Sequence, residues 1–218
     1  KCDSFGIECY DYQPQQAVKS VDKLYDGSQE IIVPDSLIEE FYEDKPVYLP
    51  EQKDKLYPNL YLVLKSESDN KKTAICRFKN YETPLRKVFT YRDIWGLSAK
   101  NKEQKFAMDL LFDKDIHVVS LTGQAGTGKT LIAAACGLEQ VLHSTKAQGG
   151  YDKLIITRPV QPMGRDIGFL PGTLEEKMMP WIAPLRDNLE YLFGDKTALD
   201  MQMEQGIIEI EAMTYIRG

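Results

Sequence analysis

Several features that would define other protein classes are missing from this 218-residue sequence. It has no apolar run near the roughly 20 residues that cross a bilayer, and its first residues lack the basic and apolar regions of a signal peptide. Its four cysteines, at positions 2, 9, 76 and 136, show no C-x-x-C spacing of a zinc or redox site. We therefore expect a soluble protein of the reducing cytoplasm, without membrane contact.

Charge is unevenly distributed along the chain, although the net charge is only −6. Residues 1–64 hold 6 Lys and Arg against 13 Asp and Glu, residues 65–105 hold 11 against 5, and the remainder holds 10 against 15. The sequence therefore contains a basic island between two acidic segments.

The most informative pattern is the run Gly123, Gln124, Ala125, Gly126, Thr127, Gly128, Lys129 and Thr130, which fits G-x-x-x-x-G-K-[ST] at every position. The short apolar run 117–121 before it is typical of a buried strand, and residues 130–142 after it are typical of a buried helix. Strand, glycine loop and helix are the context in which this motif binds a nucleoside triphosphate. The alternative is a glycine-rich turn without a ligand.

The residue types suit that chemistry. Glycines let successive backbone N–H groups turn inward and hold phosphate oxygens at the positive end of the following helix. Lys129 can reach the β and γ phosphates of ATP, and the Thr130 hydroxyl can ligate Mg²⁺.

Three parts follow one another along the chain. Residues 1–46 are acidic and weakly periodic, as in a linker, with one short helix over 36–42 capped by Ser36 and Glu39. Residues 47–96 alternate with period two around the turn 66–70, which predicts a small antiparallel β-rich module.

Residues 97–218 alternate helix and strand, which predicts an α/β domain with a parallel sheet between helices. We expect a helix over 102–112, strands over 153–157 and 206–213, and between those strands a helix broken near Pro180 and Pro184. A second capping box, Thr173 with Glu176, precedes that helix.

A family resemblance narrows the interpretation. The segments 101–104, 123–130, 157–172, 180–181 and 187–190 resemble the PhoH-like P-loop ATPase family over about residues 95–218. The resemblance implies a RecA-like P-loop NTPase fold, ATP and Mg²⁺ as ligands, ATP hydrolysis coupled to RNA unwinding, and assembly as a homo-oligomer, such as a hexameric ring.

The acidic arm and β-rich module are similar to the segment that joins a PIN nuclease domain to the ATPase in PIN-PhoH proteins. Nothing in these residues is typical of the PIN domain itself. P-loop ATPases also need an aspartate at the end of an apolar strand to hold the magnesium shell, and none is found here. In the family the acidic pair follows soon after a segment like 215–218. We therefore expect an ATPase domain that is incomplete at its C-terminus and inactive alone.

Three further residues have two readings each. Gln104 resembles the adenine-reading glutamine of helicase-type ATPases, but with Asn101 it also makes a good helix cap. Arg158, after a strand at the edge where α/β sheets bind ligands, could contact RNA or form a surface ion pair. Arg165 could be an arginine finger for a neighbouring subunit, or pair with Asp166 or Glu175.

The basic island interleaves cations with aromatic residues, a mixture that single-stranded nucleic acid binding uses. Lys71, Lys72, Arg77 and Lys79 are its candidate RNA contacts. A small sheet with aromatics inward and lysines in solvent fits equally well.

The preferred function is therefore an ATP-dependent, RNA helicase-like ATPase linked to RNA processing or degradation. A nucleotide-gated RNA-binding module without unwinding is the alternative. A small-molecule kinase is disfavoured by the interior of the loop and by the lack of an Arg-rich lid.

Overall fold

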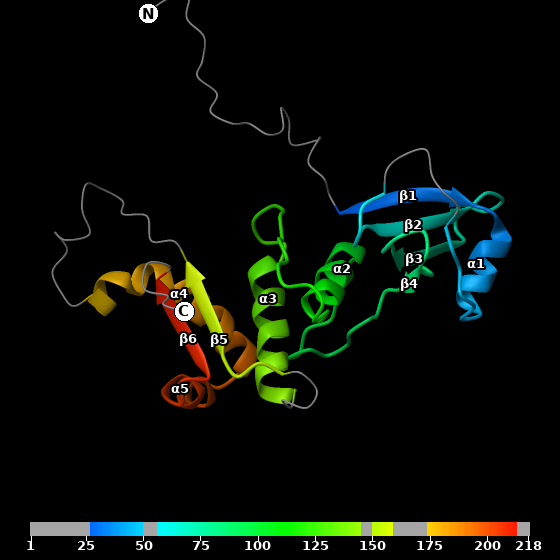
Figure 1. Cartoon of the computed structure of the whole chain (residues 1–218). Helices are drawn as coiled ribbons and strands as arrows, with labels where there is room; N and C mark the ends of the chain where they lie inside the picture. The colour runs from blue at the N-terminus through cyan, green and yellow to red at the C-terminus, as the bar shows by residue number, and fades with distance from the viewer. Residues whose placement is uncertain (1–26, 50–55, 145–149, 159–173, 213–218) are drawn as a thin grey trace, which may run out of the picture. The chain divides into compact units, whose positions relative to one another are not determined.

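The computed structural model describes residues 27–49, 56–144, 150–158 and 174–212 (Figure 1). The chain divides into two compact units, residues 1–87 and 88–218. Residues 88–96, which the sequence places with the β-rich module, therefore belong to the second unit. In the part of the chain that the structure describes, no helix is long and apolar enough to cross a bilayer.

The first unit is a four-stranded mixed sheet with one helix. Its elements are β1 (Ser28–Val33), α1 (Asp35–Tyr42), β2 (Tyr61–Ser66), β3 (Thr73–Arg77) and β4 (Arg86–Lys87), and the strand order is β1-β2-β3-β4. Strand β1 pairs with β2 in parallel, whereas β2–β3 and β3–β4 are antiparallel. The expected hairpin is confirmed, and its turn closes through Lys72 N–H donating to Asp69 O.

Two expectations for this unit are wrong. Residues 28–33 form a strand instead of a structureless arm, and they escape the period-two test because Ile31, Ile32 and Val33 are consecutive apolar residues. Helix α1 begins at Asp35 without a side-chain cap, so Ser36 and Glu39 do not make a capping box. Asp35 instead faces the hairpin, and Glu39 pairs with Lys72.

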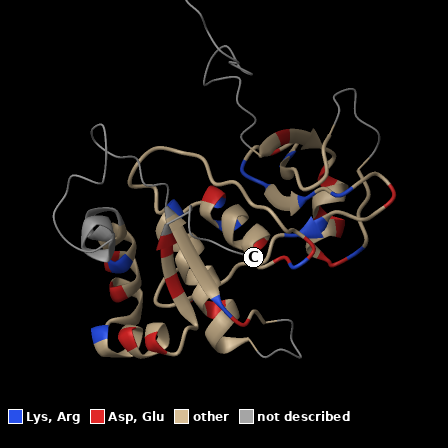
Figure 2. Cartoon of the chain, turned by 60° about the vertical axis from the view of Figure 1, so that its left-hand side comes forward, with Lys and Arg blue, Asp and Glu red and all other residues tan. Residues whose placement is uncertain are grey.

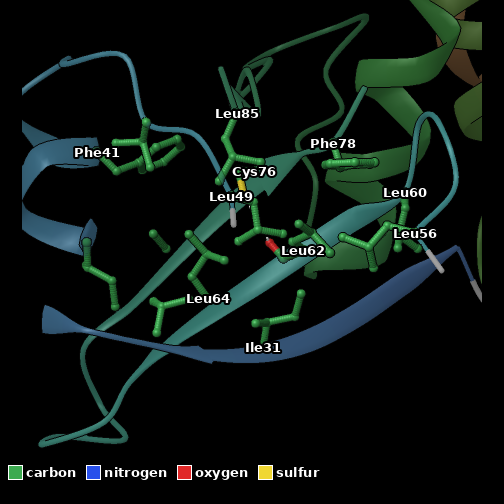
Figure 3. Close-up of a cluster of buried hydrophobic side chains, with 14 residues drawn as sticks. Ile31, Phe41, Leu49, Leu56, Leu60, Leu62, Leu64, Cys76, Phe78 and Leu85 are labelled. Atoms are coloured by element: carbon green, nitrogen blue, oxygen red, sulfur yellow. Dashed lines mark hydrogen bonds between the residues drawn. The ribbon is translucent and has the colours of Figure 1, made fainter. Parts of the chain in front are cut away.

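Period-two alternation produces the core of the first unit (Figure 3). Leu62 and Leu64 of β2 and Cys76 of β3 lie on one face of the sheet, where they pack against Ile38 and Phe41 of α1. Each of these five side chains is at most 4% exposed. Burial raises the pKa of the Cys76 thiol to about 12, so this cysteine is a packing residue and not a reactive thiolate.

The second unit combines helices with a parallel strand pair. Its elements are α2 (Lys102–Leu111), α3 (Lys129–Leu138), the π-helical turn η3 (Glu139–His143), β5 (Leu154–Arg158), α4 (Leu174–Phe193), α5 (Lys196–Glu204) and β6 (Ile208–Ala212). Strands β5 and β6 are parallel, with Leu154 opposite Ile208. The expected strands over 153–157 and 206–213 and the helix over 102–112 are thus confirmed within one or two residues.

Helix α3 packs closely on the strand pair. A Cβ atom at Gly137 would lie 2.8 Å from Leu154 Cδ1, so the absence of a side chain there allows the approach. Ala135 and Leu138 of α3 share a core with Leu189, Leu199 and Ile208, all buried. On another side of α3, Ile132 and Cys136 pack against Met108 of α2. Helix α3, which starts at the glycine loop, is therefore held by both α2 and the strands.

The break that the sequence predicts in the long helix of the second unit is absent. Helix α4 runs without interruption from Leu174 to Phe193 through Pro180 and Pro184, although each proline removes one main-chain donor. The buried contacts of Leu189 and Leu192 anchor its second half. Residue Thr173 of the second capping box lies outside the described residues.

Residues 117–121 are not a buried strand in this structure. Val118 is 86% exposed, and none of the described strands pairs with the segment. A short apolar run gives a segment strand propensity, but a strand forms only where a neighbour pairs with its backbone hydrogen-bonding groups. The α/β class is confirmed, whereas the RecA-like arrangement of the sheet stays a prediction, since the described part of this sheet has two strands.

Asp35 provides a pH test of the first unit. Its carboxylate accepts hydrogen bonds from the hydroxyls of Ser66 and Ser68, and these bonds hold its pKa below the usual range. A depressed folded pKa stabilises the fold above the unfolded pKa of about 3.9, and that contribution is lost as pH falls through the folded pKa. In Asp35→Asn we expect a smaller loss of stability between about pH 5 and pH 3 than in the native chain.

Denaturant titrations followed by NMR signals of β2 measure this effect for the first unit alone. Glu40→Gln, an exposed charge change on the same helix, is the matched control. An acid profile of Asp35→Asn that coincides with the native one would show that the serine contacts do not lower the pKa.

Candidate nucleotide-binding site

The glycine loop adopts the backbone conformations that its sequence predicts. Gly123, Gly126 and Gly128 have φ values of 151°, 79° and 84°, a region that side chains disfavour. Gly128 is the N-cap of α3, and Lys129 is the first residue of that helix. The loop therefore delivers its peptide groups directly to the positive end of α3, where backbone N–H groups lack helical partners.

The Lys129 ammonium lies over the loop. Its Nζ donates to Gly123 O at 2.9 Å, to Gln124 O at 2.6 Å and to Thr127 Oγ1 at 3.3 Å. The Thr127 hydroxyl in turn donates to Gln124 O at 2.9 Å. A Cβ atom at Gly123 would lie 3.5 Å from Thr127 Oγ1, an ordinary van der Waals contact, so the φ of 151° is what favours glycine there. The residues present fit a phosphate chain: one cation, a helix N-terminus and glycines where the backbone must approach closely.

The predicted metal residue, Thr130, is exposed in the first turn of α3. It lines an open pocket of about 570 Å³ together with Lys129. The other lining residues are mostly apolar and carry no carboxylate: Leu111, Val119, Leu121, Ala133, Ile156, Thr157, Pro184, Leu185 and Asn188. Among the described residues, no three His, Cys, Asp or Glu side chains gather as a metal site. The role of Thr130 as a Mg²⁺ ligand stays a prediction, in which phosphate oxygens and water would supply the other ligands.

Gln104 lies beside the loop, as the sequence predicts. Its backbone N–H donates to Asn101 Oδ1 at 2.8 Å, which confirms the helix cap. Its side-chain oxygen accepts from Lys100 N at 2.7 Å, and its Nε2 donates to Thr127 O at 3.3 Å. The side chain therefore connects the start of α2 to the glycine loop, a contact that the sequence did not reveal.

The pocket also contains residues that sequence reasoning missed. Thr157, near the carboxyl end of β5, has a buried Oγ1 without a hydrogen-bond partner among the described atoms. Asn188 of α4 donates to Pro184 O at 2.8 Å and lines the same pocket. Asn188 belongs to the segment 187–190, which carries part of the family resemblance. That resemblance could have identified Asn188 as a site residue from the sequence.

The structure describes the position of only one of the two predicted arginines. Arg158 is the last residue of β5, in register with Ala212 of β6, so it stands at the carboxyl edge of the strand pair as expected. Arg165 lies outside the described residues, and its role as an arginine finger stays a prediction.

In the first unit, acidic residues neutralise much of the basic island. Lys65 pairs with Glu30 at 2.6 Å, Lys72 with Glu39 at 2.7 Å and Lys87 with Asp44 at 2.5 Å. Figure 2 shows basic and acidic residues interspersed over this unit. The described residues of the unit hold eight Lys and Arg and nine Asp and Glu.

The four candidate RNA contacts therefore differ in availability. Arg77 is only 7% exposed and Lys72 is paired, whereas Lys71 and Lys79 are exposed, and neither makes an ion pair with the described residues. Their role as RNA contacts stays a prediction, which the structure favours more for Lys71 and Lys79.

The aromatic residues of the island are mostly engaged in packing. Phe78 is buried against Tyr81, Tyr91 stacks on Phe112, and Trp95 packs against both His143 and Phe193. Phe89 is 61% exposed. The arrangement therefore favours the reading in which most aromatics face inward over the one in which they stack on bases.

Comparison with known proteins agrees with this site. The family model described as PhoH-like protein matches residues 96–218, which include the whole loop, α2 and the pocket. The chain belongs to the PhoH-like protein family. This is a family of P-loop ATPases, so the family implies nucleotide binding, and the glycine loop is the candidate site for it.

Similar proteins are longer than this chain. The chain is 39% identical over its whole length to Protein PhoH2 of Bacillus subtilis and 30% identical to Protein PhoH2 of Thermobispora bispora, covering 49% and 47% of those proteins. Protein PhoH of Escherichia coli K12 is 34% identical over 58% of the chain. No solved structure matches the chain significantly. The chain thus spans about half the length of the curated PhoH2 relatives it matches.

Gly128 tests the loop geometry. Its φ of 84° costs a residue with a side chain about 1–2 kcal/mol, and a Cβ atom would lie 3.6 Å from Gln104 Nε2. We expect Gly128→Ala to lose stability by about that amount and also to weaken ATP binding. Gly194→Ala is the matched control, because Gly194 has a φ of 67° and open space around it. The control should lose similar stability and keep its ATP affinity, as isothermal titration would show; equal ATP affinities in the two variants would contradict a special role of the loop.

Proposed function

We propose that this chain binds ATP and Mg²⁺ through its glycine loop, and that the longer protein couples ATP hydrolysis to RNA unwinding. The observation that carries the ATP part is the Lys129 ammonium, held by three oxygens of a loop whose glycines have positive φ. The RNA part rests on the family resemblance and on the exposed cations Lys71 and Lys79.

Phosphate binding would exchange one set of contacts for another. Lys129 would turn from the loop carbonyls to the β and γ phosphates, where a charge-assisted hydrogen bond is stronger than a bond to a neutral carbonyl. The freed position over the loop is bordered by Gly123, Thr127 and the first turn of α3. Thr130 would hold Mg²⁺, which would supply positive charge to neutralise the phosphates during phosphoryl transfer.

Hydrolysis needs a carboxylate that the described pocket lacks. None of the side chains lining it beside Lys129 and Thr130 is acidic. We therefore expect this chain alone to hydrolyse ATP near the background rate, with the acidic pair supplied by other parts of the longer protein.

The lack of a carboxylate in the described pocket is also compatible with the alternative function. In that function the chain is a nucleotide-gated RNA-binding module in which ATP switches an assembly. RNA-stimulated ATP turnover by the full-length protein separates the two functions, because a gated module binds RNA without accelerating turnover. Homo-oligomeric assembly, a PIN nuclease domain in the longer protein and a cytoplasmic location belong to the proposal and rest on the resemblance.

Lys129→Ala tests the ATP site. Loss of a charge-assisted contact costs about 1.5–3 kcal/mol, so ATP affinity should fall roughly 10- to 150-fold in a titration. Lys196→Ala is the matched control, because Lys196 is likewise the first residue of a helix, α5, and lines no part of the pocket. Native ATP affinity in Lys129→Ala would refute the proposed phosphate contact.

The RNA proposal predicts a difference between two lysine variants. The log–log salt slope of affinity for single-stranded RNA is about −0.7 per neutralised phosphate. Lys71→Gln with Lys79→Gln should therefore make the slope shallower by up to about 1.4. Lys72→Gln should leave the slope nearly unchanged, because Lys72 already pairs with Glu39. Identical slopes in the native chain and the double variant would move RNA binding away from this unit.

A further inference from the structure

The side-chain amide of Gln104 makes two hydrogen bonds that are unrelated to the recognition of a base. Its Nε2 donates to the carbonyl of Thr127, inside the glycine loop, while its Oε1 is held by Lys100 N. The side chain is thus fixed at both ends of its amide, and one end holds a loop peptide.

The held carbonyl determines where the next N–H group points. In a trans peptide the C=O and N–H bonds lie in one plane and point in opposite directions. A bond from Gln104 to Thr127 O therefore directs the N–H of Gly128 away from Gln104. Gly128 has a φ of 84° and no Cβ, so no side chain at this residue limits the rotation of the peptide.

Thr127 takes part in the neighbouring hydrogen bonds of the loop as well. The Thr127 hydroxyl donates to Gln124 O and lies 3.3 Å from Lys129 Nζ. Thr127 therefore links the Gln104 amide on one side to the Lys129 ammonium on the other. The start of α2, capped by Asn101, is the fixed point from which this chain of bonds extends.

We propose that Gln104 is a positioning residue for phosphate binding, which orients the Thr127–Gly128 peptide so that the Gly128 N–H can meet a phosphate oxygen. The inference rests on the proposed ATP site. It differs from adenine reading because it requires no base. A glutamine amide has two donor hydrogens and two acceptor lone pairs, so one donor and one acceptor of Gln104 remain for a base.

The experiment uses ligands with and without a base: ATP, GTP and inorganic tripolyphosphate, each titrated against the full chain. Gln104→Met keeps the length of the side chain and removes both polar bonds without adding charge. Loss of one neutral hydrogen bond should weaken all three ligands by a similar factor, about 2- to 10-fold. Gln205→Met, at the C-terminal cap of α5, is the matched control and should bind all three like the native chain.

A second measurement reports on the peptide itself. In Gln104→Met the NMR amide signal of Gly128 should shift, whereas the signals of Ala135 and Leu138 in α3 stay in place. If Gln104→Met fails to fold, Gln104→Asn, whose amide is one methylene too short to reach Thr127, serves in both measurements.

The outcomes separate the alternatives. Weaker ATP with unchanged tripolyphosphate would make Gln104 a base reader only and overturn the proposal. Native affinity for all three ligands, or an unmoved Gly128 signal, would also overturn it while leaving the ATP site intact. Failure of the native chain to bind any of the three ligands would instead overturn the proposed ATP site, and this inference with it.

Discussion

The site depends on the contact between the Lys129 ammonium and the oxygens of its own loop. Carbonyl groups gathered on one side of a loop repel one another unless a cation lies among them. Lys129 Nζ meets that need at Gly123 and Gln124, and positive φ at Gly126 and Gly128 allows the chain to bend around it. Because carbonyls and amides alternate along the backbone, a loop that offers its oxygens to lysine has N–H groups available for an anion. One interaction thus organises both the loop and its binding capacity.

In the folded first unit, acidic and basic residues from different segments of the chain pair with one another, which the net charges of the segments do not reveal. The acidic and basic segments are separated along the chain, yet β1 and α1 bring Glu30 and Glu39 beside Lys65 and Lys72. The parallel pairing of β1 with β2 requires a crossover, and α1 lies within it, so the same connection that completes the sheet delivers the counter-charges. A basic stretch of sequence therefore becomes a nearly neutral unit. Exposed pairs of this kind contribute little stability each, but they reduce the attraction of the surface for polyanions.

Local signals were readable from the sequence, and long-range ones were not. The loop, the Asn101 cap and the β2–β3 hairpin follow from residues within a few positions of each other, and all three are confirmed. Strand β1 was missed because its partner lies some 30 residues away in a parallel pairing that leaves no turn signature. The strand predicted over 117–121 is absent, because an apolar pattern alone does not show which strand the segment could pair with. The Gln104–Thr127 contact joins two elements whose approach depends on α2 packing against α3.

The geometry of the strand pair explains why residues near 129 and 157 share one pocket. Thr157 lies near the carboxyl end of β5, and the loop follows the carboxyl end of the segment 117–121. Val119 and Leu121 of that segment line the pocket together with Ile156 of β5. Both segments thus present their carboxyl ends to the same region, which is where α/β proteins bind ligands. Arg158 is the next residue along β5. Arg158 therefore directly follows a residue that lines the pocket, so a ligand that contacts Arg158 would lie close to a ligand in the pocket.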